Sequence, residues 1–87
     1  MYYVYMLRCE DNSIYTGITT NIERRMNEHF FNLNDKAAKY TKSHKPARLE
    51  AVFKFDSRSS ASKEEYRIKH LNKEEKEKII SKYKNEI

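Results

Sequence analysis

Arg25 and His29 stand one turn apart in a segment whose apolar residues recur with the period of a helix. On a helical wheel with Ile22 at 0°, Arg25 falls at about −60° and His29 at about −20°, whereas Arg24 falls at about 200°. We therefore expect Arg25 and His29 at the edge of the buried face and Arg24 in water. There a guanidinium can bind an anion and an imidazole can transfer a proton. A boundary histidine satisfied by a neighbour and an arginine stem covering apolar surface are the alternatives.

Two adjacent glutamates flank a second apolar stripe. With Ala61 at 0°, Glu65 falls at about 40° and Glu64 at about −60°, on either side of the apolar residues. A carboxylate at that edge can hold a divalent metal, because hard cations take oxygen ligands, and it can equally pair with Arg25. The wheel does not decide between the two acids.

Tyrosines and the single glycine of the chain mark the N-terminal region, which contains Tyr2, Tyr3, Tyr5, Tyr15 and Gly17. Tyrosine favours strands, so packing alone explains any one of them. A phenol in a positively charged site can also lose its proton and act as a base. The glycine, at the end of a predicted strand, indicates close backbone approach or a special φ, with an ordinary strand-end bend as the alternative.

One segment carries the whole net charge of +5. It has five cations and no acid, namely Lys36, Lys39, Lys42, Lys45 and Arg48. Such clustering indicates a polyanion partner, most often nucleic acid, and a solvated lysine-rich loop is the alternative. Tyr40, set among these lysines, can stack on an unpaired base or can anchor the loop to the core.

Composition limits the class of protein. The 87 residues, 38% hydrophobic and 36% charged, suit a single domain (1–87) with one small core. The lone cysteine excludes an internal disulfide, and no apolar run resembles a membrane span or a signal sequence. No glycine-rich phosphate loop, Cys-His zinc set or nucleophile elbow is present. We therefore expect a cytoplasmic domain without membrane contact or organic cofactor.

Periodicity predicts an α+β fold, a small three-stranded sheet covered by helices in the order β-β-α-β-α-α. Strands are expected at 2–9, 14–18 and 48–55, and the direction of the third is open. The first helix is expected to begin with a capping box of Thr20 and Glu23 and to end at 32–34, and a loop then runs from about 34 to 47. The second helix is expected from residue 59 or 60 to about 71, and the third is capped by Asn72 with Glu75.

Tyr5 and Tyr15 can share a site only if both project from the same face of the predicted hairpin. Opposed residues in an antiparallel pair have a constant index sum, and that sum must be even to place these two on one face. An even sum requires a connection of odd length. A four-residue turn over 10–13 would put the two tyrosines on opposite faces unless a bulge compensates.

Two short motifs, Tyr3-Val4-Tyr5 and Tyr15-Thr16-Gly17, together resemble the paired signature of the GIY-YIG nuclease superfamily. The resemblance continues over 21–29, over Lys39-Tyr40-Thr41 followed by Pro46, and over 61–69, and it is to the small stand-alone bacterial members. In those members a glutamate precedes Ile-Lys by three positions, which selects Glu65 over Glu64. The chain departs from the signature at two places, where Tyr3 replaces a glycine and Thr16 replaces an isoleucine.

The resemblance implies an endonuclease that hydrolyses phosphodiester bonds in DNA with one divalent ion, Mg²⁺ or Mn²⁺. It implies that Glu65 binds the metal. The structure of the DNA is left open, and branched and damaged DNA are among the candidates. A non-catalytic nucleic-acid-binding protein on the same scaffold is the first alternative, and a structural or protein-binding module with relic motifs is the second.

The resemblance also implies roles for the remaining polar residues of the site. Arg25 would bind the scissile phosphate, and Tyr5 would act as general base or water positioner, with Tyr15 supporting it at the phosphate. His29 would assist by hydrogen bonding or proton transfer. Gly17 would let the backbone approach the site.

Overall fold

The computed structural model describes residues 1–32 and 35–86. Its centre is an antiparallel sheet of three strands in the order β2-β1-β3. The strands are β1 (Tyr2–Cys9), β2 (Ile14–Thr19) and β3 (Pro46–Phe55). Both neighbours of β1 run antiparallel to it, which settles the direction of the third strand. The α+β class predicted from the sequence is confirmed.

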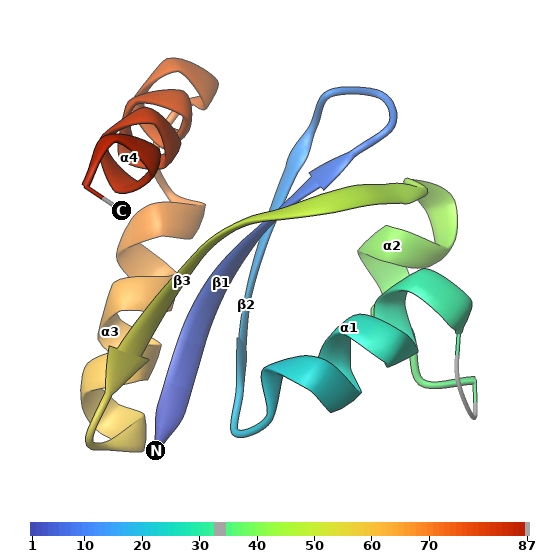
Figure 1. Cartoon of the computed structure of the whole chain (residues 1–87), viewed down its shortest axis with the longest axis horizontal. Coiled ribbons are helices and arrows are strands. Elements are labelled where there is room, and N and C mark those ends of the chain that lie inside the picture. The colour runs from blue at the N-terminus through green and yellow to red at the C-terminus, as the bar shows by residue number, and fades with distance from the viewer. Residues whose placement is uncertain (33–34, 87) are drawn as a thin grey trace.

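Helices cover the sheet from two sides. They are α1 (Ile22–Phe31), α2 (Lys39–Ser43), α3 (Arg58–Lys69) and α4 (Lys73–Asn85). In Figure 1, α3 and α4 stand on one side of the sheet, and α1 and α2 stand on the other. The predicted order is confirmed with one addition, because α2 forms a single short turn of helix inside the segment expected to be a loop.

The hairpin turn places the two tyrosines on one face. Four residues separate the strands, but the Cys9 N–H donates to the Ser13 carbonyl at 2.9 Å and so continues the ladder. The remaining three-residue loop ends at Asn12, whose φ of 70° is a left-handed conformation that asparagine tolerates. Tyr5 therefore faces Gly17 and Leu7 faces Tyr15, so the index sum is even. The connection is odd in length, as a shared site requires.

The helix starts differ from expectation at two of three places. The side chain of Asn21, not that of Thr20, caps α1 by accepting from the Arg24 N–H at 3.0 Å, so the capping box at Thr20 was wrong. Ser57 caps α3, which begins one or two residues earlier than expected. The capping box of Asn72 at α4 is confirmed. The apolar repeat that predicts α1 runs from Ile22 through Met26 and Phe30 to Leu33, and the last of these lies outside the described residues.

The main hydrophobic core lies between the sheet and the pair α3 and α4. Every second residue of β1 contributes to it, and its buried members are Val4, Met6, Ile14, Ala51, Ala61, Ile68 and Ile80. The other face of β1 carries Tyr5 and therefore looks toward α1. None of the helices within the described ranges is long and apolar enough to cross a membrane.

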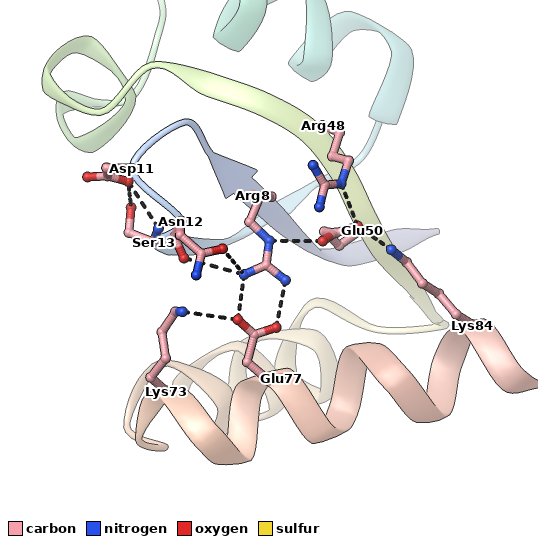
Figure 2. Close-up of polar contacts among 9 residues, drawn as sticks. All are labelled: Arg8, Asp11, Asn12, Ser13, Arg48, Glu50, Lys73, Glu77 and Lys84. Carbon is pink, nitrogen blue, oxygen red and sulfur yellow. Dashed lines mark hydrogen bonds and ion pairs between the residues drawn. The ribbon is translucent and has the colours of Figure 1, made fainter.

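An ion network joins the rim of this core to α4 (Figure 2). The guanidinium of Arg8, on β1, donates to Glu50 of β3 at 2.9 Å and to Glu77 of α4 at 2.6 Å. Arg8 is 7% exposed and Glu50 is 4% exposed. Lys84 and Arg48 also donate to Glu50. Three elements distant in sequence are thus held by paired, largely buried charges.

The hydroxyl of Thr16 is buried without a hydrogen-bond partner among the described residues, 1–32 and 35–86. The whole residue is 2% exposed. A buried hydroxyl without a partner loses its hydration and gains nothing in return. We expect Thr16→Val, nearly the same in shape, to raise the free energy of unfolding by about 1 kcal/mol in urea titrations.

The matched control is Thr19→Val. Thr19 is also buried, but its hydroxyl oxygen accepts from the Asn21 N–H at 3.1 Å. The same chemical change should lower stability there. If Thr16→Val lowers stability as well, the Thr16 hydroxyl has a partner and the expectation fails.

Candidate active site

Tyr5 lies across the backbone of its cross-strand neighbour Gly17. A Cβ added at Gly17 would stand 2.4 Å from the Tyr5 hydroxyl oxygen and 2.5 Å from Cζ of the same ring. The glycine has no positive φ, so its role is steric. The Tyr15 ring lies beside this pair, with its centroid 6.2 Å from that of Tyr5. The glycine is thus needed because an aromatic ring occupies the place of a side chain.

His29 joins the tyrosines from α1. Its Nε2 is 2.7 Å from the Tyr5 hydroxyl oxygen, and its Nδ1 is 2.8 Å from Oγ1 of Thr41. The imidazole ring is also 5.4 Å, centroid to centroid, from the ring of Tyr15. Burial lowers the pKa of His29 to about 4, and the positive charge of Arg25 acts in the same direction. The imidazole is therefore neutral at neutral pH and keeps one ring nitrogen free to accept a hydrogen bond.

The Tyr5 side chain is completely buried, which the sequence did not indicate. Its exposed fraction is 0%. Burial raises the pKa of the Tyr5 phenol well above its ordinary value, Tyr15 adds to the rise, and Arg25 opposes it. The phenol therefore stays protonated, and a water reaches it only after a neighbouring group moves.

The two neighbouring arginines of α1 differ as the helical wheel predicted. The Arg25 side chain is 20% exposed, whereas that of Arg24 is 53% exposed. Arg25 Nη1 donates to Glu28 Oε1 at 2.8 Å and to the Lys36 carbonyl oxygen at 2.7 Å. Its charge acts on both Tyr5 and His29. Arg25 thus lies at the mouth of the cluster and is held there by an acid and a backbone carbonyl.

The two glutamates of α3 point to different neighbours. Glu64 accepts from the Arg67 side chain at 2.7 Å and 2.8 Å. Glu65 Oε2 lies 3.4 Å from Nζ of Lys69, and the same Nζ is 5.8 Å from the centroid of the Tyr15 ring. The negative charge of Glu65 also contributes to raising the Tyr5 pKa. Glu65 is therefore the glutamate that faces the tyrosines.

A single carboxylate limits the kind of metal that can bind. Among residues 1–32 and 35–86, no group of three or more His, Cys, Asp or Glu side chains is placed to hold a metal. The Glu65 side chain is 20% exposed. Mg²⁺ keeps several waters and is commonly bound through one or two carboxylates and substrate phosphates. Glu65 fits an ion of that kind, and the donor set does not fit a closed structural site.

The basic segment, defined here as residues 35–45, is docked on the hairpin. Tyr40 stacks on Tyr15 with centroids 5.6 Å apart and on His44 with centroids 4.0 Å apart. His44 Nδ1 lies 2.6 Å from the Asp11 carboxylate in the hairpin turn. The Glu10 N–H donates to the Lys45 carbonyl at 2.8 Å. Tyr40 therefore anchors the segment, which was one of its two predicted roles.

The cations predicted to bind nucleic acid differ in whether they contact an acidic side chain of the protein. Lys36 and Lys39 are exposed. Lys42 and Lys45 are exposed too, but each lies within 4.0 Å of an acid, Asp35 or Glu10. Arg48 belongs to β3, and its guanidinium donates to Glu50 at 3.3 Å, in the ion network of Figure 2. A pocket of about 590 Å³ between α1 and α2 includes Lys42 and Lys45 in its lining.

Two residues of the cluster received no role in the sequence analysis. Lys69 could have been assigned one, because it follows Glu65 by four residues and therefore shares its helix face. Thr41 belongs to a motif of the resemblance, but its contact with His29 was not predictable, because that contact depends on the short helix α2. Five predicted residues, Tyr5, Tyr15, Arg25, His29 and Glu65, are brought together around these two.

Comparison with known proteins defines the class. The family model described as the GIY-YIG catalytic domain matches residues 1–79. The chain belongs to the GIY-YIG family, a family of nuclease type.

Within that family, the chain is similar to small UPF0213 proteins. One, from Fusobacterium nucleatum, is 56% identical over 93% of this chain and 78% of the relative. Another, from the archaeon Natronomonas pharaonis, is 42% identical over 92% of this chain and 91% of the relative. The solution NMR structure of a UPF0213 protein from Bacillus halodurans has a TM-score of 0.59 and 44% identity, covering 93% of this chain and 84% of that one.

Proposed function

We propose that this protein is a divalent-metal-dependent endonuclease that hydrolyses phosphodiester bonds in DNA. One observation carries the proposal. Phenol, imidazole, guanidinium and carboxylate groups from β1, β2, α1 and α3 gather around one partly buried point, beside a segment rich in lysine. Membership of a nuclease-type family supports the same reading.

Arg25 and Glu65 would stabilise the negative charge of the phosphate. The guanidinium of Arg25 has planar donors that match phosphate oxygens, and bound phosphate can replace its contact with the Lys36 carbonyl. Glu65 would hold the Mg²⁺ or Mn²⁺, which when bound stabilises negative charge on the phosphate and the leaving oxygen. The Tyr15 hydroxyl lies beside the same group of side chains and can donate to a phosphate oxygen.

Tyr5 and His29 would remove a proton from the attacking water. Because Tyr5 stays protonated, its phenol oxygen can take a proton from the attacking water only as its own proton passes to His29 Nε2. The water then attacks phosphorus as hydroxide, the bond from phosphorus to the leaving oxygen breaks with its electrons on that oxygen, and the Tyr5 proton resides on the imidazole. This transfer needs neutral His29, which the lowered pKa supplies at neutral pH.

A non-catalytic nucleic-acid-binding protein is the second candidate, and the burial of Tyr5 favours it. In this arrangement the Tyr5 phenol has no exposed surface, and Arg25 is already bonded to Glu28 and to a backbone carbonyl. Such a protein would bind DNA through its lysines without cleaving it. The two candidates differ in one measurable property, strand scission.

The test is nicking of supercoiled plasmid and of a branched DNA in the presence of Mg²⁺ or Mn²⁺. We expect Glu65→Gln to lose activity by about a thousandfold, because metal stabilisation of the transition state is worth several kcal/mol. The matched control is Glu64→Gln, since Glu64 is the adjacent residue and pairs with Arg67. No scission by the wild type would refute the nuclease and leave the binding protein. Equal activity of the two variants would refute the role of Glu65 as the metal ligand.

DNA affinity should depend on the basic segment. Each phosphate neutralised contributes about −0.9 to the slope of log K against log salt for duplex DNA. We expect the triple change of Lys36, Lys39 and Lys42 to Gln to flatten this slope and to weaken binding to all sequences alike. The control changes three exposed or half-exposed lysines of α4, Lys76, Lys78 and Lys82, to Gln. If only the control variant flattens the slope, α4 is the DNA-binding surface.

A further inference from the structure

Thr41 connects the basic segment to the Tyr5–His29 pair. It belongs to α2 and is 5% exposed. Its Oγ1 lies 2.8 Å from His29 Nδ1 and donates to the Ala38 carbonyl oxygen at 3.1 Å. The four groups form a continuous chain from the Tyr5 phenol, through both ring nitrogens of His29 and the Thr41 hydroxyl, to a backbone carbonyl.

Counting hydrogens along this chain favours one tautomer of His29. A threonine hydroxyl has one hydrogen, and a carbonyl oxygen can only accept, so the contact with the Ala38 carbonyl uses the Thr41 hydrogen. The Thr41 oxygen then accepts from Nδ1–H of His29. A neutral imidazole has one N–H, so Nε2 is bare and accepts from the Tyr5 hydroxyl.

The opposite tautomer is disfavoured by burial. With the hydrogen on Nε2, the ring would donate to the Tyr5 oxygen, and the Tyr5 hydroxyl would need another acceptor. Tyr5 is completely buried, and among the described residues His29 is the one acceptor within hydrogen-bond distance of its hydroxyl. An unmade hydrogen bond of a buried hydroxyl is unfavourable by about 1–3 kcal/mol.

We propose that Thr41 is a positioning residue that holds His29 in the tautomer whose bare Nε2 faces Tyr5. The inference rests on the proposed function, in which Nε2 receives the Tyr5 proton. Thr41 stands between Lys39 and Lys42 in the basic segment. The segment proposed to bind DNA therefore also fixes which nitrogen of His29 is free to accept the Tyr5 proton. Docking of this segment, through the stacking of Tyr40 on Tyr15, thereby becomes a condition for proton transfer.

The primary test observes the imidazole directly. In ¹⁵N-labelled protein at neutral pH, NMR should show the His29 hydrogen on Nδ1 in the wild type and in Thr41→Ser. In Thr41→Val the hydrogen should redistribute toward Nε2. Thr16→Val is the matched control, because it removes a buried threonine hydroxyl that has no described partner and should leave His29 unchanged. A hydrogen on Nε2 in the wild type, or an unchanged tautomer in Thr41→Val, would overturn the inference.

The second test measures rate and affinity separately. In single-turnover nicking of plasmid, Thr41→Val should slow scission by about tenfold to a hundredfold while DNA affinity stays the same. This loss is no larger than the lower end of the roughly hundredfold to ten-thousandfold that general acid–base catalysis contributes, because the variant displaces the base and does not remove it. Thr41→Ser should restore the rate. Equal losses in the two variants would overturn the inference. Should the wild type fail to nick, the proposed function falls, and the NMR result alone decides the tautomer.

Discussion

Arg8→Met is expected to lower the free energy of unfolding by about 1.5–3 kcal/mol, because two carboxylates lose hydrogen bonds from a charged donor. Lysine and arginine neighbours of Glu50 and Glu77 remain and keep the loss below that of an uncompensated buried charge. Arg8 donates to Glu50 and Glu77 at once, and Glu50 is 4% exposed. Methionine fills much of the space of the arginine stem, so the loss reports the charge and not a cavity. Urea titration at neutral pH measures it.

The pH dependence supplies an independent signature of the same network. Hydrogen bonding from Arg8 lowers the pKa of Glu77 from 4.5 to about 2. Burial opposes the same change at Glu50, but hydrogen bonds from Lys84 and Arg8 outweigh it, and its pKa is lowered too. A depressed pKa in the folded state stabilises the protein above the ordinary pKa, and this stability is lost as the pH falls. The wild type should therefore weaken as the pH falls from 4.5 toward about 2.

The matched control separates the buried network from an ordinary surface pair. Arg67 also bonds a glutamate bidentately, but its side chain is 55% exposed. Exposed pairs contribute about 0.2–1 kcal/mol, so Arg67→Met should change stability little. Arg8→Met should also flatten the acid dependence of stability, and Arg67→Met should leave most of it. Comparable losses in both variants would mean that the network contributes no more than a surface pair.

This network was not predictable from the sequence, although the strands that carry it were. Arg8 is 42 residues from Glu50 and 69 residues from Glu77. The contact of Arg8 with Glu50 lies next to a register irregularity between Met6 and Leu7 in the pairing of β1 with β3. Alternation of side chains along a strand predicts a face, but it does not predict which distant residue lies opposite after a bulge.

In the candidate site, too, features within one helix were predictable from the sequence, whereas contacts between distant elements were not. Helical periodicity separated Arg25 from Arg24, because both belong to one helix and differ only in angle. The choice of Glu65 over Glu64 needed the resemblance, since both flank the apolar stripe. The contact of Thr41 with His29 could not be predicted, because a five-residue helix has too little periodicity to be recognised in a basic segment.

Gly17→Ala is expected to slow DNA nicking by about a hundredfold, because a misplacement near 1 Å at a reacting group has an effect of that size. The added Cβ would stand 2.4 Å from the Tyr5 hydroxyl oxygen, so the ring must move. The ring is fully buried and its hydroxyl is 2.7 Å from His29, so movement breaks that hydrogen bond. Overpacking of this kind should also lower stability by about 1–3 kcal/mol, measured by urea titration.

A double-mutant cycle with Tyr5→Leu identifies the Tyr5 ring as the cause. Leucine lacks the Cζ and hydroxyl atoms that the new Cβ would meet, so the two shortest contacts at Gly17 should disappear in that background and leave Tyr15 Cε2 at 3.0 Å. The loss of stability caused by Gly17→Ala should therefore become much smaller when Tyr5 is leucine, which is a large coupling energy for a contacting pair. If Gly17→Ala is equally destabilising in both backgrounds, the glycine serves the strand and not the ring, and its link to the proposed proton transfer is lost.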